Sequence, residues 1–127
     1  MVAPKKDTLQ SLEAMLRELA LGYPEAHEDF PWGERVIKVR KKIFLFLGLG
    51  PEGLGLSVKL PYSHGLALTF LWTQPAGYGL GKAGWVSARV PRSQDVPWEL
   101  LEEWVDESYR AVAPKGLSAT LPPVSRG

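Results

Sequence analysis

The chain of 127 residues contains no cysteine, and this absence excludes several kinds of chemistry at once. Without a thiol there is no disulfide bond, no thiolate metal site and no cysteine nucleophile. Since an absence of cysteine fits a reducing compartment, we expect a cytoplasmic protein. No apolar run approaches the roughly 18 residues that span a bilayer, and no apolar signal core follows Lys5 and Lys6. The sequence therefore predicts no membrane partner.

The chain also lacks a large excess of charge of either sign. It has 15 basic and 14 acidic residues, and its formal net charge is +1. Any affinity for a polyanion must therefore come from a local cluster of cations. With 45% hydrophobic residues, the chain is long enough to bury a core as one domain, which we expect over residues 1–113. Residues 114–127 contain three prolines and little pattern, which predicts a disordered tail.

What the chain does contain is helical periodicity near both ends of the predicted domain. One helix is expected over about residues 8–21, a second over about 63–72 and a third over about 96–113. The apolar stripe of the first is Leu9, Leu12, Leu16 and Leu19, and that of the third is Leu101, Val105, Tyr109 and Val112. These stripes predict helices that pack one face against a common core.

Alternating patterns between the helices predict strands near 34–40, 42–49, 54–60 and 85–90, after a loop at 23–33. In the second strand, Phe44 and Phe46 are expected on one face, opposite Ile43, Leu45 and Leu47. The glycine-rich segment 73–84 leaves room for a short strand around Tyr78. The order α-β-β-β-α-(β)-β-α predicts an α+β fold, with the helices on one face of an antiparallel sheet.

The strand patterns also gather basic residues on the sheet face opposite the helices. If Ile37 and Val39 face the helices, Lys38 and Arg40 face away from them. Extending this phase along the sheet adds Lys59, Trp85 and Arg89, and Lys41, Lys42, Lys82 and Arg92 are expected at the rim of this face. The candidate nucleic-acid-binding set is therefore Lys38, Arg40, Lys59, Lys82, Trp85 and Arg89. Such a face suits phosphate contacts and base stacking. The alternative is a solvated sheet face that lysine and arginine keep soluble.

Other clusters point away from catalysis. Glu25, His27, Glu28 and Asp29 lie within five residues, but their spacing matches no metal loop, so we expect a helix N-cap or ion pairs with residues 38–42 rather than a metal site. The run Gly77-x-Gly79-x-Gly81 lacks the context of a dinucleotide loop or a P-loop. His64 directly follows Ser63, which indicates helix capping and not a catalytic pair. The sequence predicts no cofactor and no enzyme.

Several blocks of sequence follow one another in a fixed order over residues 8–113. They are Tyr23-Pro24-Glu25-Ala26, Glu28-Asp29-Phe30-Pro31-Trp32-Gly33, Val36-Ile37-Lys38-Val39, Leu56-Ser57-Val58-Lys59, Gly77-Tyr78-Gly79, Gly84-Trp85-Val86 and Glu107-Ser108-Tyr109-Arg110. Together these blocks resemble the MmcQ/YjbR proteins. The resemblance implies a small domain of the CyaY-like or secretion-chaperone-like type. It also implies DNA binding, since members of the family are commonly described as double-wing DNA-binding proteins.

Three functional hypotheses follow from these observations. The favoured one is a non-enzymatic domain that binds DNA weakly and in a salt-dependent manner through the basic sheet face. The alternative is a protein-partner adaptor or a chaperone-like module, which would be a dimer and would use a sheet edge. A frataxin-like metal-binding domain is a distant third, suggested by topology alone. The sequence leaves both a monomer and a dimer open.

Overall fold

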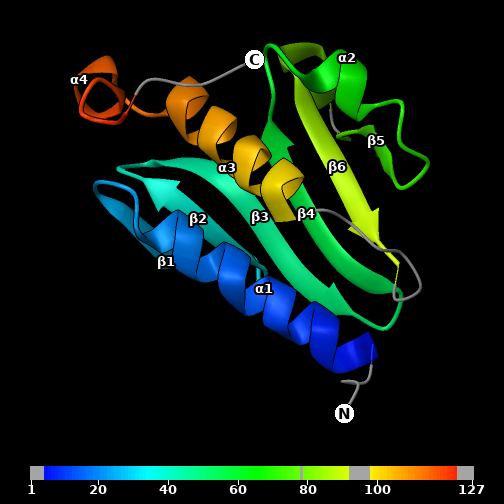
Figure 1. Cartoon of the computed structure of the whole chain (residues 1–127). Helices are drawn as coiled ribbons and strands as arrows, with labels where there is room; N and C mark the ends of the chain where they lie inside the picture. The colour runs from blue at the N-terminus through cyan, green and yellow to red at the C-terminus, as the bar shows by residue number, and fades with distance from the viewer. Residues whose placement is uncertain (1–4, 78, 92–97, 123–127) are drawn as a thin grey trace.

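In the computed structural model, which describes residues 5–77, 79–91 and 98–122, helices cover one face of a single antiparallel sheet (Figure 1). The helices are α1 (Lys5–Leu21), α2 (His64–Ala67), α3 (Trp98–Val112) and α4 (Lys115–Ser118), with a 3-10 turn η1 (Leu80–Ala83). The strands are β1 (Ala26–Asp29), β2 (Arg35–Val39), β3 (Lys42–Gly50), β4 (Gly53–Lys59), β5 (Thr73–Pro75) and β6 (Trp85–Val90). The predicted α+β class is confirmed.

The six strands lie in the order β1-β2-β3-β4-β6-β5, and every neighbouring pair is antiparallel. The first four strands form a meander, because short turns join strands that are consecutive in the chain. Gly53 begins β4 with a φ of +136°, and a Cβ there would lie 2.1 Å from the carbonyl oxygen of Val90. Only glycine permits this close approach of β4 to the end of β6.

Helices α1 and α3 lie side by side across the sheet and bury their apolar stripes against it (Figure 1). The fully buried stripe residues are Leu16 and Ala20 of α1 and Leu101, Val105 and Tyr109 of α3. The ring of Tyr109 stacks on Tyr23 at a centroid distance of 4.6 Å and meets Phe44 edge-on at 5.1 Å. Since each large buried side chain contributes about 1.5–3 kcal/mol, this layer supplies much of the stability of the domain.

A β-bulge in β3 changes the faces that the sequence predicts for this strand. Ile37 pairs with Leu45 and Lys38 pairs with Ile43, so Phe44 is an extra residue in the ladder. Because a one-residue insertion reverses the phase of the alternation, Phe44 joins Leu45 on the helix-covered face. The prediction that Phe44 and Phe46 share a face is therefore wrong, and Phe46 lies opposite Phe44.

Several elements differ from the expected boundaries. Strand β1 forms within the predicted loop at 23–33, where it pairs with β2. Helix α2 covers only 64–67 of the predicted 63–72, because the side chains of Thr69 and Thr73 bond to nearby carbonyl oxygens in place of a continuing helix. The glycine-rich segment does contain a short strand, but β5 lies at Thr73–Pro75, before the predicted position around Tyr78, which itself lies outside the described residues.

The segment after α3 contains the short helix α4, although the sequence predicts no regular structure there. Leu117 and Leu121 pack against the hydrophobic core, which explains why residues in this segment are held in place. Residues 123–127 of the predicted tail lie outside the described residues. Among the described helices, none is both long and apolar enough to cross a bilayer.

Candidate functional site

The face of the sheet opposite α1 and α3, here called the open face, carries the residues that the sequence singled out. Antiparallel partners project to the same face, so the register defines its members. Phe46 pairs with Ser57, Ser57 pairs with Ser87, and Lys59 pairs with Trp85. On the other side of β3, Lys38 pairs with Ile43. The open face therefore runs from Lys38 across to Trp85.

The sheet splits at one end of this face, between β3 and β4. The two strands pair only between residues 46–50 and 53–57, so the Phe44 carbonyl and the Lys59 N–H have no partner across the β3–β4 split. Ser108 of α3 lies between them, and its hydroxyl donates to the Phe44 carbonyl oxygen at 2.5 Å and accepts from the Lys59 N–H at 2.8 Å. This buried serine satisfies two backbone groups that the split exposes.

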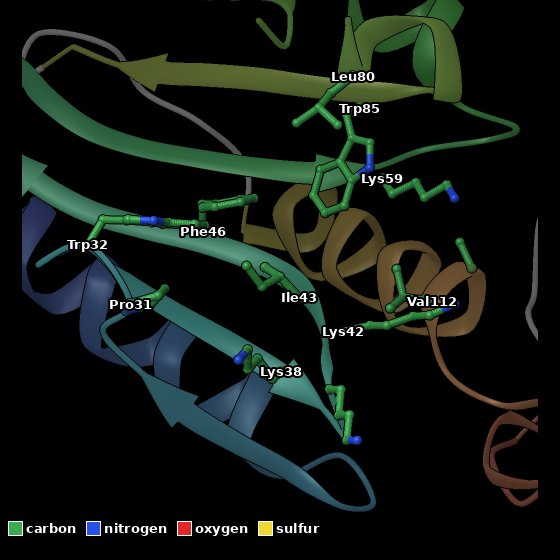
Figure 2. A pocket seen from close by; sticks show the side chains of 12 residues that line it. Pro31, Trp32, Lys38, Lys42, Ile43, Phe46, Lys59, Leu80, Trp85 and Val112 are labelled. Atoms are coloured by element: carbon green, nitrogen blue, oxygen red, sulfur yellow. The ribbon is translucent and has the colours of Figure 1, made fainter. Parts of the chain in front are cut away.

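A hollow of about 480 Å³, here called the groove, opens at the split (Figure 2). Its lining consists of Pro31, Trp32, Lys38, Lys41, Lys42, Ile43, Phe46, Lys59, Leu80, Trp85, Ala111 and Val112. Because the strands separate here, the last turn of α3 reaches the groove and contributes Val112 (Figure 2). The lining combines four lysines with three aromatic rings and includes no carboxylate.

The aromatic residues give the groove apolar walls that remain open to solvent. Trp85 is half-buried and contacts Phe46 edge-to-face, with ring centroids 5.7 Å apart. Trp32 stands in the loop before β2 and is 71% exposed, and Leu80 of η1 is 40% exposed. Concentrated apolar exposure rimmed by polar groups marks a contact surface more often than isolated exposed residues do.

The lysines of the groove differ in whether a carboxylate neutralises them. Lys38 donates to Asp29 at 3.0 Å, and this bond lowers the pKa of the Asp29 carboxyl. Lys41, Lys42 and Lys59 form no ion pair with any residue in the described part of the chain. Uncompensated ammonium groups around one concavity raise the local positive potential there, although the whole chain is nearly neutral.

The predicted patch of six residues is only partly assembled. Lys38, Lys59 and Trp85 meet in the groove, together with Lys41 and Lys42, which were expected at its rim. Arg40 occupies the turn between β2 and β3 with a φ of +55° and pairs with Glu25, and Lys82 lies exposed in η1 outside the lining. The prediction of a single patch is wrong for Arg40, because the turn conformation ends the strand alternation that placed it.

Arg89 lies on the open face but in a second hollow of about 550 Å³, where it forms an ion pair with Glu52. This hollow also contains Ser57 and Ser87, whose hydroxyl groups bond to each other at 2.9 Å. Glu13, Glu34 and Arg35 line it as well, so both signs of charge are present. Both arginines of this hollow therefore have carboxylate partners, in contrast to three of the four lysines of the groove. Arg92 lies outside the described residues.

The acidic cluster forms ion pairs, and those of Glu25 and Asp29 involve residues 38–42 as the sequence predicts, whereas Glu28 pairs outside that segment. Glu28 accepts from Arg17 at 2.6 and 3.0 Å and lies 2.8 Å from Arg35, while Glu25 pairs with Arg40. The hydrogen bonds from Arg17 are the main cause of the lowered pKa of Glu28, and those from Arg40 lower the pKa of Glu25. In the part of the chain that the structure describes, no three potential ligands group together as a metal site would require.

Ser63 and His64 do not form a catalytic pair. The hydroxyl of Ser63 donates to the buried Glu107 at 2.6 Å, and the same carboxylate accepts the backbone N–H groups of Tyr62 and Ser63. The Nδ1 atom of His64 lies 2.8 Å from the Leu60 carbonyl oxygen. Both side chains therefore hold the start of α2 in place.

Sequence reasoning missed two of the three aromatic residues of the groove, Trp32 and Phe46. The bulge hid Phe46 by reversing the phase of its strand. A usable signal for Trp32 existed in the run Pro31-Trp32-Gly33, since a tryptophan between two turn-forming residues has no regular element with which to bury itself. Leu80 and Val112 gave no signal, because their part in the groove depends on how η1 and α3 pack.

The fold and the groove together define a small α+β domain with a lysine- and aromatic-lined hollow on an uncovered sheet face. The YjbR family model matches residues 21–111, and the chain belongs to the YjbR family, which confirms the resemblance seen in its sequence. The chain is also similar to the crystal structure of the Deinococcus radiodurans protein DR2400, which carries the DUF419 domain. That similarity has 29% identity and a TM-score of 0.65, and it covers 88% of this chain and 90% of the other. No curated protein matches the chain.

Proposed function

We propose that this protein is a non-catalytic domain that binds nucleic acid, and that the groove contacts the phosphate backbone. The observation that carries the proposal is the convergence of Lys41, Lys42 and Lys59, without ion pairs to described residues, in one hollow with no carboxylate in its lining. Neutralising phosphates with such lysines releases counterions, which favours binding whatever the base sequence. We therefore expect weak binding with little sequence preference.

The proposal has a quantitative consequence for salt dependence. Each phosphate that a protein neutralises contributes a slope of about −0.7 to −0.9 to log K against log salt concentration. Three unpaired lysines in the groove therefore predict a slope of about −2 to −3. A much steeper slope would require cations from other parts of the surface.

Fluorescence anisotropy with labelled DNA over a salt series tests this proposal. Lys59→Glu should weaken binding at low salt and reduce the salt slope by about one. Lys115→Glu, which makes the same change of charge in α4 outside the groove, is the matched control and should have little effect. The proposal is overturned if no binding occurs at low salt, or if both variants weaken binding equally. Polyglutamate should compete poorly with the labelled DNA. If it competes as well as unlabelled DNA does, the groove binds polyanions in general and not nucleic acid in particular.

A second candidate function, contact with a protein partner, is favoured by a different surface. Around α2, the side chains of Tyr62, Leu66 and Leu71 are 81%, 70% and 103% exposed. Strand β5 at the neighbouring edge of the sheet pairs only with β6 among the described strands, which leaves its other side for strand addition. Light scattering should then show self-association that Leu71→Glu abolishes, while a monomer at all concentrations would exclude a dimer formed through this surface.

A further inference from the structure

We infer that the groove takes single-stranded nucleic acid, with unpaired bases stacked on its aromatic walls; this inference rests on the function proposed above. The shape of the site is the first argument. Proteins that read duplex DNA insert a convex helix or ribbon into a major groove about 12 Å wide. The open face instead presents a concavity of about 480 Å³ at a split in the sheet. A flexible strand can enter such a hollow, whereas a duplex touches only its rim.

The aromatic rings supply the second argument. Figure 2 shows Trp32 on the loop at one side of the groove and Trp85 on β6 at the other, with Phe46 of β3 between them. The edge-to-face contact with Phe46 fixes the indole of Trp85 while leaving it partly exposed. Trp32, at 71% exposure, has one of the largest exposed apolar surfaces among the described residues. Phosphate binding alone gives these rings no role, but stacking with unpaired bases does.

The placement of the charges supplies the third argument. Lys59 pairs directly with Trp85 across β4 and β6, so the Cβ atoms of these two residues lie about 4.5–5.5 Å apart on the same face. In single-stranded nucleic acid every base is followed by a phosphate. A base stacked on Trp85 would therefore place the next phosphate near the ammonium group of Lys59. On the other side of the groove, Lys42 and Lys38 stand near Ile43, so cations flank the apolar floor on both sides (Figure 2).

Three probes with the same number of phosphates test the inference by anisotropy at one low salt concentration. They are a thymidine oligonucleotide, a mixed-sequence duplex, and an abasic deoxyribose-phosphate chain. We expect the thymidine strand to bind about a hundredfold more tightly than the abasic chain, because stacking on each of the two tryptophans adds about tenfold to the phosphate contacts. It should also quench tryptophan emission more than the abasic chain does. Equal binding of the abasic chain, or tighter binding of the duplex, would overturn the inference.

The variant Trp32→Ala distinguishes binding of the bases from binding of the phosphate backbone. Because Trp32 is 71% exposed, this substitution should not disturb the fold. The variant should lose about tenfold in affinity for the thymidine strand and almost nothing for the abasic chain. Tyr62→Ala removes an exposed aromatic outside the groove and should change neither affinity. If Trp32→Ala weakens both probes equally, stacking is wrong. If all three probes bind alike, nucleic-acid binding stands without base recognition, whereas no binding by any probe removes the proposed function itself.

Discussion

Arginines and lysines are used differently in this protein. Each of the five arginines that the structure describes, Arg17, Arg35, Arg40, Arg89 and Arg110, forms an ion pair with a carboxylate. Three of the four lysines that line the groove form none with described residues. The guanidinium group presents a rigid fork that matches carboxylates, while the ammonium group sits on a flexible stem. A basic residue in a sheet pattern is therefore a weak sign of a binding surface until its partner is known.

The difference also separates two regions of the molecule. On the flank formed by α1, β1 and β2, Arg17 and Arg35 share Glu28, and Arg35 also contacts Glu13. These pairs tie the helix to the sheet edge and leave little net charge. At the split between β3 and β4, three lysines without carboxylate partners among the described residues surround partly exposed aromatic rings. The first region uses charge for structure, and in the second region these three charges are not neutralised by any described residue.

The largest expected effect is the loss of DNA affinity when unpaired lysines of the groove are changed. Reversing both Lys42 and Lys59 to Glu places two negative charges in the groove, and we expect affinity for DNA at low salt to fall by roughly a hundredfold. Anisotropy at several salt concentrations measures the loss, which should shrink as salt rises.

A comparison variant changes Arg40 and Arg89 to Gln, which removes two paired positive charges without adding negative ones. Because Glu25 and Glu52 already neutralise these arginines, the double variant should bind DNA within about twofold of the wild type. If the arginine variant loses as much affinity as the lysine variant, the distinction between paired and unpaired cations has no bearing on binding.

The next effect concerns the serine that holds the split in the sheet. Ser108→Ala leaves the buried carbonyl of Phe44 and the N–H of Lys59 without their partner, which should cost about 1–3 kcal/mol of unfolding free energy. Urea denaturation measures this cost. Ser118→Ala, on the short helix α4, should change stability by less than about 0.5 kcal/mol. A Ser108→Ala protein as stable as the wild type would show that water replaces the hydroxyl.

The sequence anticipated those features that depend on simple alternation. In β2, β4 and β6 the period of two places Lys38, Lys59 and Trp85 correctly on the open face. It failed in β3 because the bulge at Phe44 is a one-residue insertion that no residue type announces. It also failed for β1, whose residues Ala-His-Glu-Asp show no apolar alternation and are held through tertiary ion pairs.

Ion pairing was anticipated only in part, because the sequence indicated the pairs of residues 38–42 with the acidic cluster but not the partners of Arg17 and Arg89. Arg89 pairs with Glu52, which lies 37 residues away in the sequence. Arg17 of α1 pairs with Glu28 of β1. Such partners depend on the register of the sheet and on how α1 crosses it. The candidate set could therefore be selected from the sequence only as a group of cations, and the structure separates those that are neutralised from those that are not.

A smaller effect tests the structural role of the paired flank. The hydrogen bonds from Arg17 lower the pKa of Glu28 in the folded protein, so this carboxylate stabilises the fold at pH values above its unfolded pKa of about 4.3. The contribution is lost as the pH falls through the lowered folded pKa. Glu28→Gln should thus be less stable than the wild type at neutral pH, with the two unfolding free energies converging in acid. Urea denaturation over a pH series checks this, and a constant difference would contradict it.

The smallest expected effect is a gain in DNA affinity when a paired lysine of the groove, Lys38, loses its carboxylate partner. Asp29→Asn removes the charge that neutralises Lys38 at the edge of the groove, and the amide oxygen can still accept the Phe30 N–H. We expect affinity for DNA to rise about two- to fivefold at low salt, since a fourth lysine becomes available. Glu25→Gln changes the net charge equally but frees Arg40 outside the groove lining, so it should leave affinity unchanged. An equal gain from both variants would mean that net charge, and not the position of the lysine, governs binding.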